Sequence, residues 1–274
     1  MISKISSNEY KNIKPFFTGP EFDLLLSAVQ EGNSPAQIWT DDRYNPRSAF
    51  LWDKANNVFY LSGDENNREF NNDLTEILGR KVIPELRLKH GMHFRLRATS
   101  EAWTSQLSSI FIKADLKPGR YMFFSLKSLA KLNLAAKMPA GFKLEMIDED
   151  FLFSSGYDNI EFVIGEVRQM WPSIDRFIDH GFGFSLVTSG KVVSWCTSEY
   201  VSKDRCGIGI ETLREYQNRG LATIAASAFV EHSLQRGIKP HWECDVENLV
   251  SRRVAEKIGF MKELDYPIHF GRFN

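Results

Sequence analysis

The residues whose types and spacing favour chemistry lie in one stretch, residues 207–223, which reads GIGIETLREYQNRGLAT. The alternating pattern at 206–212 predicts a strand, and the alanine-rich run at 221–235 predicts a helix. Gly220 and Ala222, at the start of that helix, are small enough for a ligand to approach the backbone closely. The first amide groups of a helix lack partners within the helix and carry the positive end of its dipole. This turn is therefore suited to bind a phosphate or pyrophosphate.

The positive charge near this turn comes from neighbouring residues and not from the net charge of the second half of the chain. Arg214 and Arg219 add positive charge, whereas residues 139–274 as a whole contain more acidic than basic side chains. A second interpretation stays open, because Gly and Ala at the start of a helix also permit close packing of the helix on a sheet. The stretch has neither the Gly-Lys-Ser/Thr of a P-loop nor the three spaced glycines of a dinucleotide-binding fingerprint.

Hydrophobic periodicity and turn residues predict a mixed α/β chain around this stretch. In the second half we expect helices at 160–171, 221–235 and 249–257, and strands at 142–147, 182–187, 192–197, 206–212, 241–246 and 264–270. In the first half we expect helices at 21–30, 67–78, 83–89, 102–112 and 126–137, and strands at 37–40, 49–53, 58–62, 92–97 and 120–125. A Pro-Ala-Gly seam follows residue 138, so we expect two domains, 1–138 and 139–274.

Composition excludes several classes of function. A net charge of -1 gives no overall attraction to nucleic acid or to an anionic membrane, and no apolar run is long enough to span a bilayer. Three cysteines fit neither a disulfide framework nor a zinc site, and six histidines show no paired spacing for a metal. We expect a cytoplasmic protein without a bound metal, and the oligomeric state stays open.

Two motifs in sequence order carry a family resemblance. Gln217-x-x-Gly220-x-Ala222 resembles the Gln/Arg-x-x-Gly-x-Gly/Ala pyrophosphate loop of the GNAT acyltransferase superfamily. The block at 242–260, with Asn248, a helix and a closing Lys-x-Gly-Phe, resembles that family's next conserved segment. The resemblance covers residues 142–270, and residues 1–138 match only as a companion domain, possibly of related fold.

The resemblance implies an α/β (α+β) fold with a twisted, mostly antiparallel mixed sheet flanked by helices. Strands 206–212 and 240–246 would splay apart and admit acetyl-CoA as co-substrate. Backbone groups near Thr212 and Leu213 would bind pantetheine. The amides of residues 218–223 would bind pyrophosphate, and Asn248 would contact the cofactor arm. The implied cofactor-binding residues are Thr212, Leu213, Gln217, Asn218, Arg219, Gly220, Leu221, Ala222, Thr223, Asn248 and Ser251.

The catalytic assignments are less specific. In this chemistry an amine attacks the thioester directly, so the ammonium must lose a proton and the departing thiolate must gain one. Glu211, near the end of a predicted strand, is the candidate base. A purely structural role for it stays open, and Glu199, Glu243 and Asp245 are its rivals.

The tyrosine that many GNAT enzymes place seven residues after the Asn is replaced here by Ala255. Tyr200, Tyr266 or solvent would then protonate the thiolate. A nucleophilic role for Cys244 is an alternative that its expected burial disfavours.

The predicted function is acetyl transfer from acetyl-CoA to a primary amine, with a small-molecule acceptor expected before a protein N-terminus or lysine. Two alternatives stay open. One is a non-catalytic acyl-CoA sensor, which the missing tyrosine favours. The other is a tandem GNAT-fold transferase that uses a different acyl or aminoacyl donor.

Overall fold

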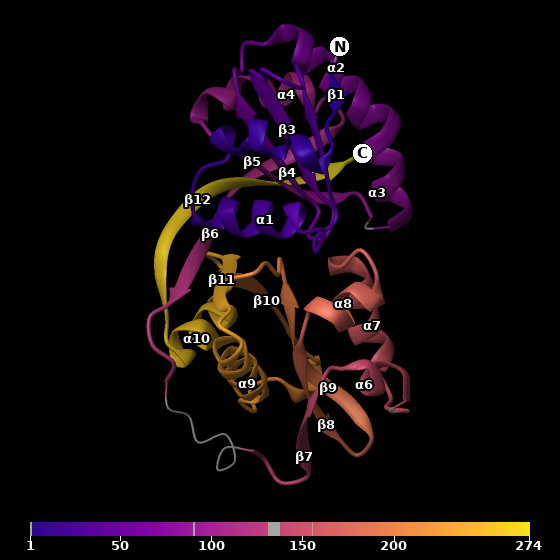
Figure 1. The fold of residues 1–274 in the computed structure, drawn as a ribbon, viewed down its shortest axis with the longest axis vertical. Coiled ribbons are helices and arrows are strands. Elements are labelled where there is room, and N and C mark those ends of the chain that lie inside the picture. Colours follow the sequence, from indigo (N-terminus) through magenta and orange to yellow (C-terminus); the bar gives the residue numbers. More distant parts are fainter. Residues whose placement is uncertain (1, 90, 131–137, 155) are drawn as a thin grey trace. The chain divides into compact units, whose positions relative to one another are not determined.

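The computed structural model describes residues 2–89, 91–130, 138–154 and 156–274. The chain forms two compact units, coloured by sequence in Figure 1. Unit 1 contains Met1–Gln30, Pro35–Arg120 and Tyr266–Asn274, and unit 2 contains Glu31–Ser34 and Tyr121–Asp265.

Unit 1 combines short helices with a mainly antiparallel sheet. Its strands are β1 (Ser3–Lys4), β2 (Ala36–Thr40), β3 (Ser48–Asp53), β4 (Val58–Gly63) and β5 (His93–Ala98), together with the ends of β6 (Ala114–Leu126) and β12 (Phe260–Phe273). Its helices are α1 (Pro20–Gln30), α2 (Arg68–Ile77), α3 (Ile83–Lys89) and α4 (Thr104–Ile110). A π-helical segment, Leu78–Val82, joins α2 to α3, and short 3-10 helices lie at Ser7–Asn12, Lys14–Phe16 and Glu101–Trp103. The strand order is β1-β2-β3-β4-β5-β12; β4 and β5 pair in parallel, whereas β1–β2, β2–β3, β3–β4 and β5–β12 pair antiparallel.

An aromatic cluster forms the centre of unit 1. Phe59 of β4 is fully buried, and five aromatic rings lie with their centroids 4.8–6.3 Å from its own: Phe50, Trp52, Phe94, Phe111 and Phe273. Rings at these separations add pairwise attraction to the free energy of burial. Since Phe273 is in β12, the C-terminal strand belongs to the core of the N-terminal unit.

The two units differ from the expected domains 1–138 and 139–274. β6 begins in unit 1 and continues into unit 2, where Tyr121–Ser125 pair with β11 (Lys239–Asp245). β12 begins in unit 2 and ends in unit 1, where His269–Arg272 pair with β5. Two long strands, β6 and β12, therefore run from one unit into the other.

The helix expected at 126–137 falls mainly on residues 131–137, which lie outside the described residues. Leu126, its expected first residue, is instead the last residue of β6.

Unit 2 contains the motif-bearing stretch. Its remaining strands are β7 (Phe142–Met146), β8 (Gly183–Thr188), β9 (Lys191–Glu199) and β10 (Arg205–Thr212). Its helices are α6 (Glu149–Ser154), α7 (Ile160–Met170), α8 (Ile174–His180), α9 (Leu221–Gln235) and α10 (Leu249–Ile258), with a 3-10 turn at Arg214–Tyr216. The strand order is β6-β11-β10-β9-β8-β7.

The pairing of β10 with β11 is short. These parallel neighbours are in register only at Arg205 with Lys239 and at Cys206 with Pro240. From Gly207 onward β10 stays paired with β9, while β11 pairs with β6 on its other side. The carboxyl ends of the two strands therefore separate, as the family resemblance implied.

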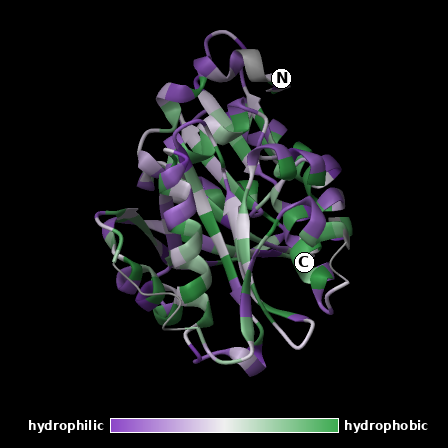
Figure 2. Cartoon of the chain, turned by 60° about the horizontal axis from the view of Figure 1, so that its bottom comes forward, coloured by the Kyte–Doolittle hydropathy of each residue, from purple (hydrophilic) through white to green (hydrophobic). Residues whose placement is uncertain are grey.

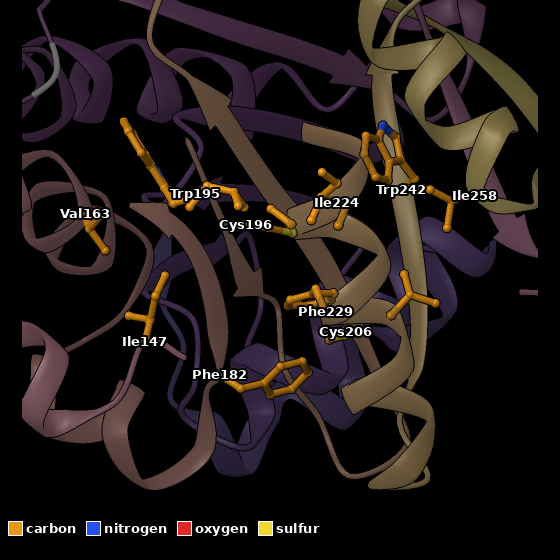
Figure 3. Packing of buried hydrophobic residues seen from close by; sticks show 14 of the residues in the cluster. Ile147, Val163, Phe182, Trp195, Cys196, Cys206, Ile224, Phe229, Trp242 and Ile258 are labelled. Carbon is orange, nitrogen blue, oxygen red and sulfur yellow. The ribbon is translucent and has the colours of Figure 1, made fainter. Parts of the chain in front are cut away.

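Helices cover both faces of this sheet. The Sγ of Cys206 lies 3.7 Å from the Oγ of Ser233 in α9. Gly209 faces the other way, because a Cβ built on it would lie 3.0 Å from Glu166 in α7. Successive strand residues point to opposite faces, so α9 and α7 lie on opposite sides of β10. Figure 3 shows the packing around α9, where the rings of Phe182 and Phe229 stack at 4.7 Å.

Hydrophilic residues lie mainly in the loops and along the outer helix faces (Figure 2). None of the described helices combines the length and hydrophobicity needed to span a bilayer.

Candidate active site

A pocket of about 560 Å³ lies in unit 2, where β10 and β11 have separated. Its walls come from the end of β10, the loop after it, the first turn of α9, Trp242 of β11 and one face of α10. The lining residues are Ile210, Glu211, Thr212, Tyr216, Gln217, Asn218, Gly220, Leu221, Ala222, Thr223, Trp242, Asn248, Val250, Ser251, Arg253, Val254 and Lys257. Nine of the eleven residues expected to bind a cofactor are in this set; Leu213 and Arg219 are not.

The start of α9 is built to leave its amides open. The N-cap is Gly220, which has no side chain to cap the helix and adopts a φ of +79°. Asn218, two residues earlier, also has a positive φ, +61°. A Cβ on Gly220 would meet no protein atom within 4 Å, so close packing on the sheet does not explain this glycine. The uncapped amides at the pocket wall are groups of the kind that bind anions at helix N-termini.

The loop before α9 is held by its own hydrogen bonds. Gln217 Nε2 donates to the Thr212 carbonyl at 3.1 Å, which ties the two ends of the loop together. The Leu213 N–H donates to the Val193 carbonyl at 2.9 Å. That amide hydrogen is therefore already in use and is removed from the groups expected to bind pantetheine, whereas the Thr212 carbonyl keeps a second lone pair.

The two arginines of the motif do not supply the charge of the pocket. The Arg219 guanidinium donates to the Glu215 carbonyl and lies 5.2 Å from the centroid of the Tyr216 ring. Neither it nor Arg214 lines the pocket. The basic side chains among the lining residues belong to α10 instead.

Asn248 and Ser251 position the start of α10. Asn248 is the N-cap, and its side chain accepts from the Ser251 N–H at 3.0 Å. The Ser251 hydroxyl accepts from Trp242 Nε1 at 2.9 Å, which joins α10 to β11. Ala255, at the position of the missing tyrosine, is fully buried against the core. This site therefore has no phenol from α10.

The candidate base lies at the pocket wall. Glu211 is exposed near the end of β10, and its carbonyl accepts from Ser194 Oγ at 3.0 Å. Of the three rivals, none lines the pocket: Glu199 ends β9, and Glu243 and Asp245 are in β11.

Glu166 of α7, which does not line the pocket, is a carboxylate that the sequence did not single out. Trp195 Nε1 donates to it at 2.6 Å, and the Thr197 hydroxyl donates to its other oxygen. Burial raises the pKa of Glu166, and the charge of Glu211 raises it further, while the two donors lower it. The available signal was an acidic residue between Val163 and Val167 on the apolar stripe of a helix.

The two candidate acids lie in different units. Tyr200, at the end of β9, has a φ of +49°, and its ring lies 3.1 Å from a Cβ built on Gly207. Such a backbone conformation is strained for an aromatic residue. Tyr266 belongs to unit 1, where Arg97 lies 3.8 Å from its ring centroid.

Cys244 is not placed to act as a nucleophile at neutral pH. Cys244 is buried, which raises its pKa to about 11, so little thiolate forms at neutral pH. No group of three His, Cys, Asp or Glu side chains among the described residues is arranged to bind a metal ion.

Two diverging strands and an uncapped helix beside them are the arrangement that the sequence motifs implied for an acyltransferase. The family model described as GNAT acetyltransferase matches residues 14–269, and the chain belongs to this family of acyltransferases. The match extends well beyond residues 142–270 and includes most of unit 1.

Similar proteins cover the whole chain. An uncharacterized N-acetyltransferase, YdfB of Bacillus subtilis, is 29% identical over 272 residues, or 98% of each chain. A GCN5-related N-acetyltransferase-like protein from Streptococcus suis has a TM-score of 0.72 at 20% identity, over 98% of this chain and 99% of its own. A tandem GNAT protein from the clavulanic acid biosynthesis pathway has a TM-score of 0.52 at 12% identity, over 100% and 98%. The structural likenesses extend the shared fold to both units.

Proposed function

We propose that this acyltransferase moves an acetyl group from acetyl-CoA to a primary amine of a small molecule. The observation that carries the proposal is the uncapped N-terminus of α9 at the wall of a pocket between two separated strands. This donor set fits CoA, because open amides suit its pyrophosphate and the gap beside β10 leaves polar backbone groups for its pantetheine arm.

Acetyl-CoA, when bound, supplies the acetyl group as a thioester. The Asn218–Thr223 turn would hold the pyrophosphate, and Asn248 and Ser251 would line the cofactor arm. Glu211 would take the proton from the acceptor ammonium, directly or through water, so that the nitrogen lone pair becomes available. The nitrogen–carbon bond then forms as the carbon–sulfur bond breaks, and no covalent enzyme intermediate is required.

The proton for the departing thiolate has two proposed sources. Tyr200 is the tyrosine of unit 2 at the end of the strand next to β10. Solvent is the other, because a thiol with an unperturbed pKa of about 8.5 leaves without an obligatory acid.

The experiment is to incubate the purified protein with acetyl-CoA and a panel of small amines. Peptides with a free N-terminus or lysine form a second panel. Free thiol is measured by absorbance and the acetylated product by mass spectrometry. The proposal predicts both products in equal amounts with at least one small amine. Acetylation confined to peptides would overturn the acceptor class.

A non-catalytic acyl-CoA sensor is the second candidate, and the burial of Ala255 where an acid is usual favours it. Tight CoA binding with no thiol release beyond the uncatalysed rate in either panel would support the sensor. A folded protein that binds no CoA would instead favour a transferase with another acyl or aminoacyl donor.

A further inference from the structure

Helix α10 separates its charged side chains onto two faces. Val250, Arg253, Val254 and Lys257 recur at helical spacing and line the pocket. Arg252 lies on another face, where its Nε is 2.7 Å from the Glu256 carboxylate. The Arg252 and Glu256 charges therefore neutralise each other, whereas the positive charges of Arg253 and Lys257 face the pocket.

Arg253 and Lys257 form no hydrogen bond or ion pair with the described residues. The residues outside the described part, 1, 90, 131–137 and 155, include no Asp or Glu, so they offer no carboxylate either. Glu211 is the single acidic residue among the lining residues, and it comes from β10. The α10 side of the pocket therefore carries two uncompensated positive charges.

These charges lie at the outer edge of the pocket. Arg253 and Lys257 are exposed, whereas Ser251 and Val254 on the same helix are only partly accessible. A CoA thioester that reacts inside the site has its nucleotide end farthest from the thioester, at the outer edge. That end carries a 3′-phosphate monoester on the ribose, with between one and two negative charges at neutral pH.

We propose that Arg253 and Lys257 bind the ribose 3′-phosphate of the CoA donor and thereby select CoA thioesters over dephospho-CoA. The inference rests on the proposed function and adds a specificity element to it. The open amides of α9 provide for the pyrophosphate, which CoA and dephospho-CoA share. Arg253 and Lys257 remain available for the 3′-phosphate, which CoA has and dephospho-CoA lacks. Arg offers a planar, bidentate donor pair and Lys a flexible point charge, and both suit a terminal phosphate.

Calorimetric titrations with CoA and with dephospho-CoA test the proposal on the wild type, Arg253→Ala, Lys257→Ala and the double variant. Wild-type protein should bind CoA at least about tenfold more tightly than dephospho-CoA. The double variant should lose about 10- to 100-fold in affinity for CoA and bind dephospho-CoA as the wild type does. Arg252→Ala removes the same charge from the same helix outside the pocket and should change neither affinity by more than about twofold.

The outcomes separate this inference from the proposed function. Equal wild-type affinities for the two ligands, or an equal loss for both in the double variant, would overturn the 3′-phosphate assignment while leaving the CoA site intact. A folded wild-type protein that binds neither ligand would overturn the proposed function, and this inference with it.

Discussion

The Glu166 carboxylate of α7 lies over Gly209 of β10, on the face of the sheet that α7 covers. A Cβ on Gly209 would lie 3.0 Å from Glu166 Oε1, and 2.5 Å from Glu199 Oε1. The glycine in β10 therefore leaves room for carboxylates, and Trp195 and Thr197 donate to one of them. An ordinary strand residue at 209 would displace these groups.

The enclosed carboxylate makes the stability of the fold depend on pH. Because the folded-state pKa of Glu166 is raised, its contribution to stability is fully present below the unfolded pKa, about 4.3, and is lost as pH rises through the folded value. Glu166→Gln cannot ionise. The stability of Glu166→Gln relative to wild type should therefore increase as pH rises through that window.

Urea unfolding between pH 4 and 8 measures this difference, and the exposed Glu161→Gln on the same helix is the control. Glu166→Gln should also lose some stability at every pH. Trp195 and Thr197 donate to different oxygens of Glu166, and the Gln amide has only one oxygen. A difference between Glu166→Gln and wild type that stays flat across the range would contradict the assigned pKa shift.

Glu211→Gln should lower turnover by about 10²- to 10⁴-fold if Glu211 takes the ammonium proton. Its affinity for CoA should stay within about twofold, since Glu211 is exposed and contributes no cofactor phosphate contact. Glu215→Gln, exposed in the 3-10 turn that follows β10 and outside the pocket wall, should keep full activity. Equal rates for both variants would remove Glu211 from the reaction.

Asn248 has a structural role and a proposed binding role that can be separated. Asn248→Ala removes the side-chain acceptor of the Ser251 N–H and should cost about 1 kcal/mol of stability. Asn248→Ser keeps a capping hydroxyl and should cost only a few tenths of that. Both should weaken CoA binding if the Asn side chain contacts the cofactor arm. Wild-type affinity in the serine variant would restrict Asn248 to capping.

Cys244 should be dispensable for the chemistry. Its pKa of about 11 leaves a negligible thiolate fraction at neutral pH, so Cys244→Ala should retain turnover within a fewfold of wild type. The substitution should lower stability by about 1 kcal/mol or less, because it removes one buried sulfur atom. Loss of turnover with CoA affinity intact would contradict direct transfer.

Local sequence signals indicated which residues line the pocket better than they indicated the boundaries of the units. The turn at Gly220 and the cap at Asn248 are determined by residues adjacent in sequence, so their positions in the pocket followed from the motifs. The path of β12 was not predictable, because its pairing with β5 depends on residues more than 170 positions apart. Short elements such as α6 and α8 also lacked the length for a periodic signal.

The sequence motif likewise did not indicate which charged side chains line the pocket. Arg219 lies within the motif, yet its side chain donates to the Glu215 carbonyl. Arg253 and Lys257 line the pocket because their spacing places both on one face of α10. Glu166 lies on the apolar stripe of α7, and only its donors on β9 show that the carboxylate is accommodated there.

The most direct test of the account is calorimetric titration of acetyl-CoA into wild type, Gly220→Val and Gly237→Val. Both glycines have positive φ, +79° and +73°, and a Cβ on either meets no atom within 4 Å. The two substitutions therefore impose similar backbone strain, and only Gly220 lines the pocket. We predict that Gly220→Val abolishes acetyl-CoA binding while Gly237→Val retains the wild-type dissociation constant. Equal affinity in all three folded proteins would contradict the assignment of the α9 turn as the donor site.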